Sequence, residues 1–109
     1  MTHELDPTRR EQSVIKRSPV KGSRNVKVSF VLPRDGGGVS VVGDFNNWNP
    51  LAHPLRPRRN GTRSVALTLP AGGRYAFRYL AEGGRWHDDE AAEAFEPNGV
   101  GGFNAVLET

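Results

Sequence analysis

Short segments in which apolar and polar residues alternate recur along this chain of 109 residues. The clearest is residues 74–82 (RYAFRYLAE), where Tyr75, Phe77 and Tyr79 share one face and Arg78 lies on the other. A period of two is typical of a β-strand with one buried face. Residues 24–109 contain no long segment with the period of a helix, so the pattern predicts an all-β domain.

Turn sequences separate these segments, including PRDGGG at residues 33–38, Asn60-Gly61, PAGG at residues 70–73 and Gly83-Gly84. Asn-Gly is a strong signal for a two-residue hairpin turn. About seven short strands with such spacing predict an immunoglobulin-like antiparallel β-sandwich over residues 24–109. The predicted strands are residues 25–32, 39–44, a short piece around Leu55, 65–69, 74–82, 85–87 and 103–107, with residues 88–102 as a long loop.

The first 23 residues lack a sustained period. Asp6-Pro7 is a plausible helix start, but Val14 and Ile15 are the only apolar pair after it, and Ser18-Pro19 would end a helix. This segment is therefore predicted to be a mobile basic tail, residues 1–23, with at most two helical turns.

Charge is uneven along the sequence. Residues 1–34 hold eight Lys or Arg and three acids, whereas residues 35–109 hold seven basic and nine acidic residues. A basic segment is compatible with nucleic-acid contact, but no aromatic side chain precedes Phe30 to stack on a base. We therefore expect a solvated tail and no nucleic-acid partner. No apolar run approaches the roughly 18 residues of a membrane helix, and no secretory signal is present, so a cytoplasmic protein without a membrane partner is expected.

Catalytic and metal-binding patterns are weak in this sequence. The absence of cysteine excludes disulfides and thiolate metal sites, and His3, His53 and His87 lack metal-ligand spacing. Glycoside hydrolysis needs two carboxylates about 5–9.5 Å apart across a sugar. The consecutive acids at residues 88–90 lie in a predicted surface loop, where solvated side chains are the expected outcome. The sequence predicts no catalytic residue, no metal and no cofactor.

The two tryptophans carry more information. Trp48 lies in a polar loop (GDFNNWNP), and Trp86 follows the Gly83-Gly84 turn. An indole beside amide side chains suits a sugar, because its flat face covers the C–H face of a pyranose while amides and Arg bind the hydroxyls. Either indole could instead close the end of the sandwich, and the pattern leaves both possibilities open.

Three strings in order, VVGDFNNWNP (residues 41–50), LPAGGRYAFRYLAEGGRW (residues 69–86) and PNGVGGFN (residues 97–104), resemble the family 48 carbohydrate-binding modules. This family includes the N-terminal early set domain of isoamylases and glycogen branching enzymes and the glycogen-binding domain of the AMP-activated protein kinase β subunit. The resemblance covers residues from about 15 to the C-terminus. It implies an immunoglobulin-like sandwich that binds α-1,4-glucans.

The resemblance also implies the site residues. The family's two tryptophans correspond to Trp48 and Trp86, its basic strand residue to Arg78, and its C-terminal amide to Asn104. We therefore expect non-catalytic binding of a glycogen-like α-glucan by a stand-alone module. The alternative is a protein-interaction or regulatory module, or an accessory subunit of a glucan-active enzyme, with little sugar binding of its own.

Overall fold

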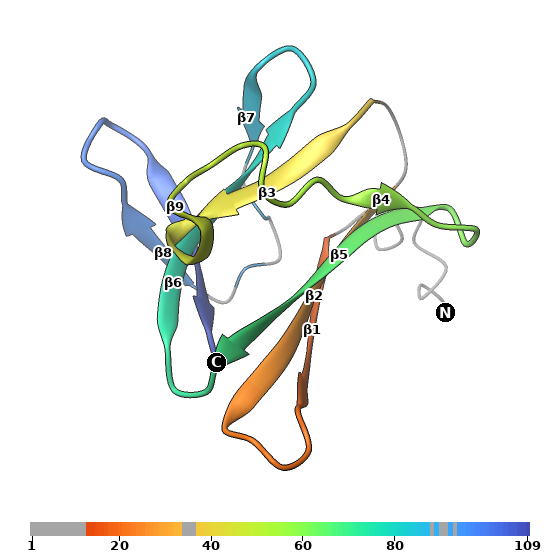
Figure 1. The fold of residues 1–109 in the computed structure, drawn as a ribbon. Coiled ribbons are helices and arrows are strands. Elements are labelled where there is room, and N and C mark those ends of the chain that lie inside the picture. The colour runs from red at the N-terminus through yellow and green to blue at the C-terminus, as the bar shows by residue number, and fades with distance from the viewer. Residues whose placement is uncertain (1–12, 34–36, 88, 90–91, 93) are drawn as a thin grey trace, which may run out of the picture.

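The computed structural model describes residues 13–33, 37–87, 89, 92 and 94–109. In this part of the chain, nine strands form two antiparallel sheets that face each other (Figure 1). The first sheet has the order β1-β2-β5-β4, and the second has the order β3-β6-β9-β8, with β7 also paired to β6. The predicted all-β immunoglobulin-like sandwich is confirmed. The strands are β1 (Val14–Pro19), β2 (Asn25–Pro33), β3 (Val39–Gly43), β4 (Arg56–Pro57), β5 (Thr62–Pro70), β6 (Arg74–Ala81), β7 (Arg85–His87), β8 (Ala94–Pro97) and β9 (Phe103–Glu108).

Alternation along the long strands decides which side chains are buried. In β2, Val28, Phe30 and Leu32 are buried, and β5 pairs with this strand in a register that places Leu67 opposite Val28. In β6, Phe77 and Tyr79 are fully buried, while Arg78 between them is half-buried. Since successive strand residues point to opposite faces, the period of two in the sequence fixes the inner faces of both sheets.

Aromatic rings fill the centre of the sandwich. Phe30 of the first sheet meets Phe77 of the second edge-on, with ring centroids 5.4 Å apart, and Tyr79 meets Phe77 in the same way at 5.8 Å. Phe45 lies 5.6 Å from Phe30 and 6.1 Å from Tyr75. Because Phe45 belongs to the turn after β3, the core also anchors that turn.

Two strands lie where the sequence predicted none. β1 falls inside the segment 1–23 that was predicted as a tail, and β8 falls inside the predicted loop 88–102. Neither strand has a clear period of two in its sequence. In the structure, β1 joins the sheet by pairing with β2, and Ile15 packs against the core. The sandwich therefore includes residues 14–19. The predicted helix start at Asp6-Pro7 lies outside the described residues.

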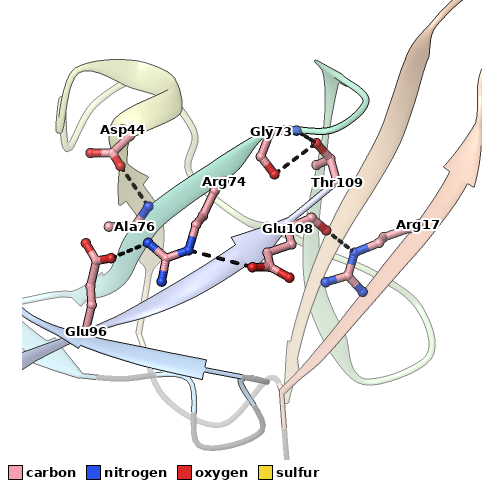
Figure 2. Close-up of polar contacts among 8 residues, drawn as sticks. All are labelled: Arg17, Asp44, Gly73, Arg74, Ala76, Glu96, Glu108 and Thr109. Carbon is pink, nitrogen blue, oxygen red and sulfur yellow. Dashed lines mark hydrogen bonds and ion pairs between the residues drawn. The ribbon is translucent and has the colours of Figure 1, made fainter.

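Polar contacts connect the ends of the two sheets (Figure 2). The Arg17 guanidinium of β1 donates to the backbone carbonyl of Glu108 in β9 at 2.9 Å. Arg74 of β6 forms ion pairs with Glu96 at 2.7 Å and Glu108 at 3.6 Å, across three neighbouring strands. Within the described ranges, no helix is long and apolar enough to span a membrane.

Candidate functional site

The outer face of the second sheet has a junction at Arg78. β9 pairs with the first half of β6, up to Phe77 opposite Ala105, and β7 pairs with the second half, from Tyr79 opposite His87. Asn104 is one residue beyond the last β9 pair, so it lies beside Arg78. Trp86 pairs with Leu80, two residues along from Arg78 and therefore on the same face. The register alone thus brings three predicted site residues together.

Trp48 reaches the same face from the turn after β3. This turn begins with the 3-10 helix η2 (Asp44–Asn46), and both Asn47 and Trp48 have left-handed backbone conformations, with φ of 57° and 58°. A bulky residue adopts this conformation only when its surroundings hold it there. Two contacts do so: the Trp48 backbone N–H donates to the Gly43 carbonyl at 2.9 Å, and the indole is bound through Asp44.

Asp44 connects the turn to β6. One carboxylate oxygen accepts the Trp48 indole N–H at 2.9 Å, and the other accepts the backbone N–H of Ala76 at 2.8 Å (Figure 2 shows the second contact). Asn46 holds the turn from the other side: its Oδ1 accepts the Gly43 N–H, and its Nδ2 donates to the Val41 carbonyl. The amide of Asn46 is therefore structural, so not every amide near Trp48 is available to a ligand.

Arg78 and Trp86 contact each other directly. The guanidinium carbon lies 5.6 Å from the centroid of the Trp86 ring, which is a cation–π arrangement. The Trp86 side chain remains 45% exposed, whereas Trp48 is half-buried. The alternative in which Trp86 closes the end of the sandwich is thus contradicted, because neither indole belongs to the buried core cluster.

These side chains line one open cleft of about 260 Å³. Its walls are Trp48, Arg78, Trp86, Asn98 and Asn104. The cleft combines two indoles with one guanidinium and two amides, and no carboxylate lines it among the described residues. Such a surface offers flat apolar faces with hydrogen-bond donors and acceptors at their edges. It is suited to bind a neutral, hydroxyl-rich ligand and lacks an acid–base pair.

The structure adds Asn98, which was not predicted from the sequence as a site residue. Its Oδ1 accepts the backbone N–H groups of Val100 at 2.9 Å and Gly102 at 3.0 Å, which closes the turn between β8 and β9. Since the oxygen is occupied, the amide nitrogen is the atom that the side chain can offer to the cleft. The only signal in the sequence was Asn98-Gly99, which reads as a turn.

The acidic segment differs from its prediction. Asp89 was expected to be solvated, but it is 1% exposed and its carboxylate accepts a hydrogen bond from the Ser13 hydroxyl. Burial, with the nearby Asp89 charge as the second cause, raises the pKa of Tyr79 well above its ordinary value. Asp88 and Glu90 lie outside the described residues. Asp89 is not among the residues that line the cleft.

Comparison with known proteins assigns the chain to a family. The family model described as carbohydrate-binding module 48 (isoamylase N-terminal domain) matches residues 34–95, which is more than half of the chain. The chain belongs to carbohydrate-binding module family 48. The match spans Trp48, Arg78 and Trp86, and it supports the resemblance on which the site residues were predicted. Modules of this family bind carbohydrate and are non-catalytic.

Relatives of this family 48 module include 1,4-alpha-glucan branching enzymes. The enzyme from Xanthomonas campestris pv. campestris is 42% identical over 48 residues, which is 43% of this chain and 7% of the enzyme. The enzyme from Nitrobacter winogradskyi is 42% identical over 55 residues, 50% of this chain and 8% of the enzyme. The enzyme from Cupriavidus pinatubonensis is 32% identical over 79 residues, 72% of this chain and 10% of the enzyme. The chain thus spans at most about a tenth of these relatives.

Proposed function

We propose that this module binds α-1,4-glucan, such as glycogen or a starch-like polysaccharide, without chemical conversion. The observation that supports the proposal is the cleft in which Trp48, Arg78, Trp86 and Asn104 meet, joined by Asn98. Family membership supplies the ligand class, and the names of the relatives supply the link to α-1,4-glucan.

The two indoles provide the apolar part of this binding. Each ring can cover the C–H face of a glucose unit, which removes apolar surface of both partners from water. Arg78 and Asn104 line the same cleft, where they can bind hydroxyl groups. The contact of Arg78 with Trp86 restricts the guanidinium before the ligand arrives, so less side-chain entropy is lost on binding.

Binding at one such site should be weak. The cleft is open, and a ligand on an open surface loses little of its own hydration. Multivalency strengthens binding only where two or more modules are linked. For one module we therefore expect detectable retention on glycogen, which presents many equivalent sites, and weak binding of a short maltooligosaccharide.

The proposal excludes hydrolysis and branching by this chain. Both reactions on a glycosidic bond require a pair of carboxyl groups at the scissile bond. None of the five acids in the described ranges lines the cleft: Asp44 is bonded to Trp48 and Ala76, Asp89 is buried beside Ser13, and Glu82, Glu96 and Glu108 are not among its lining residues. Purified protein should release no reducing sugar from glycogen above a blank.

The test is migration in a native gel with and without glycogen, for the wild type and for Trp48→Ala and Trp86→Ala. Loss of an aromatic anchor commonly costs about 2 kcal/mol, roughly thirtyfold in affinity, so both variants should lose retardation. Phe95→Ala is the matched control, because Phe95 is 46% exposed but does not line the cleft.

Thermal melts separate binding from folding in the same variants. Replacing a core indole by Ala would lower the free energy of unfolding by about 3–5 kcal/mol. Replacing an exposed indole should leave a cooperative melt near the wild-type temperature. Retention of glycogen binding by both folded tryptophan variants would overturn the proposal.

A second candidate function is docking on a glucan-active enzyme, and one observation favours it. Phe103 is 57% exposed and Phe95 is 46% exposed, and the β8–β9 register places them on the same face of this hairpin, with Pro97 opposite Phe103. Exposed apolar side chains that cluster in this way mark interaction surfaces. Binding of a purified branching enzyme that Phe103→Ser abolishes, with glycogen binding unchanged, would support this role.

A further inference from the structure

Positive charge is concentrated in the first sheet. In the described ranges 13–33 and 56–70, which make up this sheet and its hairpin turns, there are nine basic residues and no acid. The other described residues contain three basic and five acidic side chains. The nine are Lys16, Arg17, Lys21, Arg24, Lys27, Arg56, Arg58, Arg59 and Arg63; the others are Arg74, Arg78, Arg85, Asp44, Glu82, Asp89, Glu96 and Glu108.

The strand register places part of this charge on the outer face of the sheet. Lys16 pairs with Ser29, Lys27 pairs with Thr68 on one side and Ser18 on the other, and Arg56 pairs with Ser64. Their neighbours along the strands, such as Val28 and Leu67, point into the core. We define the basic face as Lys16, Lys27, Arg56 and Arg58, with Ser18, Ser29, Ser64 and Thr68 between them.

Arg58 is held on this face by hydrogen bonds. Its Nε donates to the Ser64 hydroxyl at 2.8 Å, and a terminal nitrogen donates to the Ser64 carbonyl at 3.2 Å. These contacts fix the guanidinium at the edge of the sheet while it remains exposed.

Among the described residues of the first sheet, no carboxylate lies beside the other cations of the basic face, Lys16, Lys27 and Arg56. Lys16 and Lys27 are diagonal neighbours on β1 and β2, a distance at which long side chains of like charge repel. Surfaces of soluble domains usually intersperse both signs of charge. A sheet face with cations and hydroxyl groups, and without acids among its described residues, is complementary to an external polyanion.

We propose that the basic face binds the sugar–phosphate backbone of double-stranded nucleic acid without reading its sequence. Lys and Arg with Ser and Thr are the side chains that contact phosphate oxygens in such complexes. The face carries no aromatic side chain to stack an unpaired base, which argues against a single strand. Among the described residues of the first sheet, Val14, at 43%, is the one exposed large apolar residue, which is too little to insert into a bilayer.

This inference revises the expectation that nucleic acid is not a partner. That expectation rested on the lack of a stacking side chain in a tail, whereas the structure shows Lys16 in a strand of a folded sheet. A duplex backbone needs charge and hydroxyl groups and no stacking. The basic face lies on the side of the sandwich opposite Arg78, so the two surfaces can be occupied together. The proposal does not depend on glucan binding.

The experiment is a fluorescence anisotropy titration of a labelled 20-base-pair duplex over a range of salt concentrations. The face variant is Lys16→Gln with Lys27→Gln. The control is Lys21→Gln with Arg85→Gln, which removes the same charge from exposed residues outside the face. A third variant, Lys16→Arg with Lys27→Arg, keeps the charge of the face.

The logarithm of affinity should fall linearly with the logarithm of salt concentration, with a slope of about 0.9 for each phosphate contact. For the face variant, this slope should be smaller by the equivalent of roughly two phosphate contacts. Its affinity at low salt should be at least about tenfold weaker. The control and the Lys-to-Arg variant should keep the wild-type slope, and a duplex of unrelated sequence should bind equally well.

Four results would overturn the proposal. Equal losses in the face and control variants would show a response to net charge alone, and no duplex binding at 50 mM salt would show no site. Face-dependent binding to phosphatidylglycerol vesicles without duplex binding would identify a membrane surface. Face-dependent self-association without nucleic acid would identify a second copy of the chain as the occupant.

Discussion

The Trp48 indole and the Asp44 carboxylate are joined by a hydrogen bond of 2.9 Å. The same carboxylate binds the backbone N–H of Ala76, in the strand that carries Arg78. Asp44 does not line the cleft, but it positions two residues that do: Trp48 directly, and Arg78 through β6. Any change at Asp44 should alter ligand binding by moving Trp48 relative to β6, without removing a group that contacts the glucan.

Replacement of Asp44 by Ala should weaken both properties of the module. It removes two accepted hydrogen bonds, so we expect about 1–2 kcal/mol of lost stability and a severalfold loss of glycogen retention. Asp44→Asn keeps one acceptor oxygen and should fall between Ala and the wild type. Thermal melts and native gels on glycogen measure the two effects. Unchanged glycogen retention in Asp44→Ala would show that Trp48 is positioned by other contacts.

Asn98 offers a variant that separates the turn from the ligand contact. Asn98→Asp keeps the oxygen that accepts the Val100 and Gly102 N–H groups but replaces the amide nitrogen with a second acceptor. It should therefore keep the wild-type melting temperature and lose glycogen affinity severalfold. Asn98→Ala should lower both the melting temperature and the glycogen affinity. If Asn98→Asp binds glycogen like the wild type, the amide nitrogen does not contact the ligand.

The strands with a clear period were predictable from the sequence. Phe30 in β2 and Tyr79 in β6 are buried as the alternation requires, because a strand exposes one face and buries the other. β1 was not predictable, because only Val14 and Ile15 are apolar in it and its strand conformation depends on hydrogen bonds to β2. β8 is short and depends in the same way on β9.

The site was predictable only through resemblance to a family. The period of two placed Arg78 on an outer face, but it could not show that Trp48 and Asn104 come to the same place, since that depends on the register between distant strands. Asn98 was not predicted because Asn98-Gly99 indicates only a turn. The pattern gives no sign that the amide nitrogen is left over for the cleft. Asp89 was assigned to solvent because its partner, Ser13, is 76 residues away in the chain.

Gly43 should not tolerate a side chain. A Cβ at this position would lie 2.4 Å from the Ala76 carbonyl oxygen and 2.7 Å from the Phe77 Cβ, both of them in β6. We expect Gly43→Ala to cost about 1–3 kcal/mol, because β3 and β6 must separate to accept the methyl group. Gly38→Ala is the control, since its nearest contact would be 3.8 Å away. Urea unfolding curves of the two variants measure the difference, and equal midpoints would contradict this reason for Gly43.

Tyr79 should make the stability of the module fall at alkaline pH. Burial, followed by the charge of Asp89, raises the pKa of Tyr79 well above its ordinary value of 10.0, so the folded state keeps the phenol proton while the unfolded state releases it. Above pH 10 the unfolded state thus binds fewer protons, and the free energy of unfolding should decrease by about 1 kcal/mol between pH 10 and 11 from this group.

Removal of the hydroxyl tests this assignment. The Tyr79 hydroxyl is buried without a hydrogen-bond partner among the described residues, so Tyr79→Phe should be at least as stable as the wild type at pH 7. Between pH 10 and 11 the variant should lose less stability per pH unit than the wild type. Tyr75→Phe is the control, because it retains Tyr79 and should keep the wild-type slope. Urea unfolding at several pH values provides the measurement, and equal slopes in Tyr79→Phe and the wild type would assign the alkaline loss to another group.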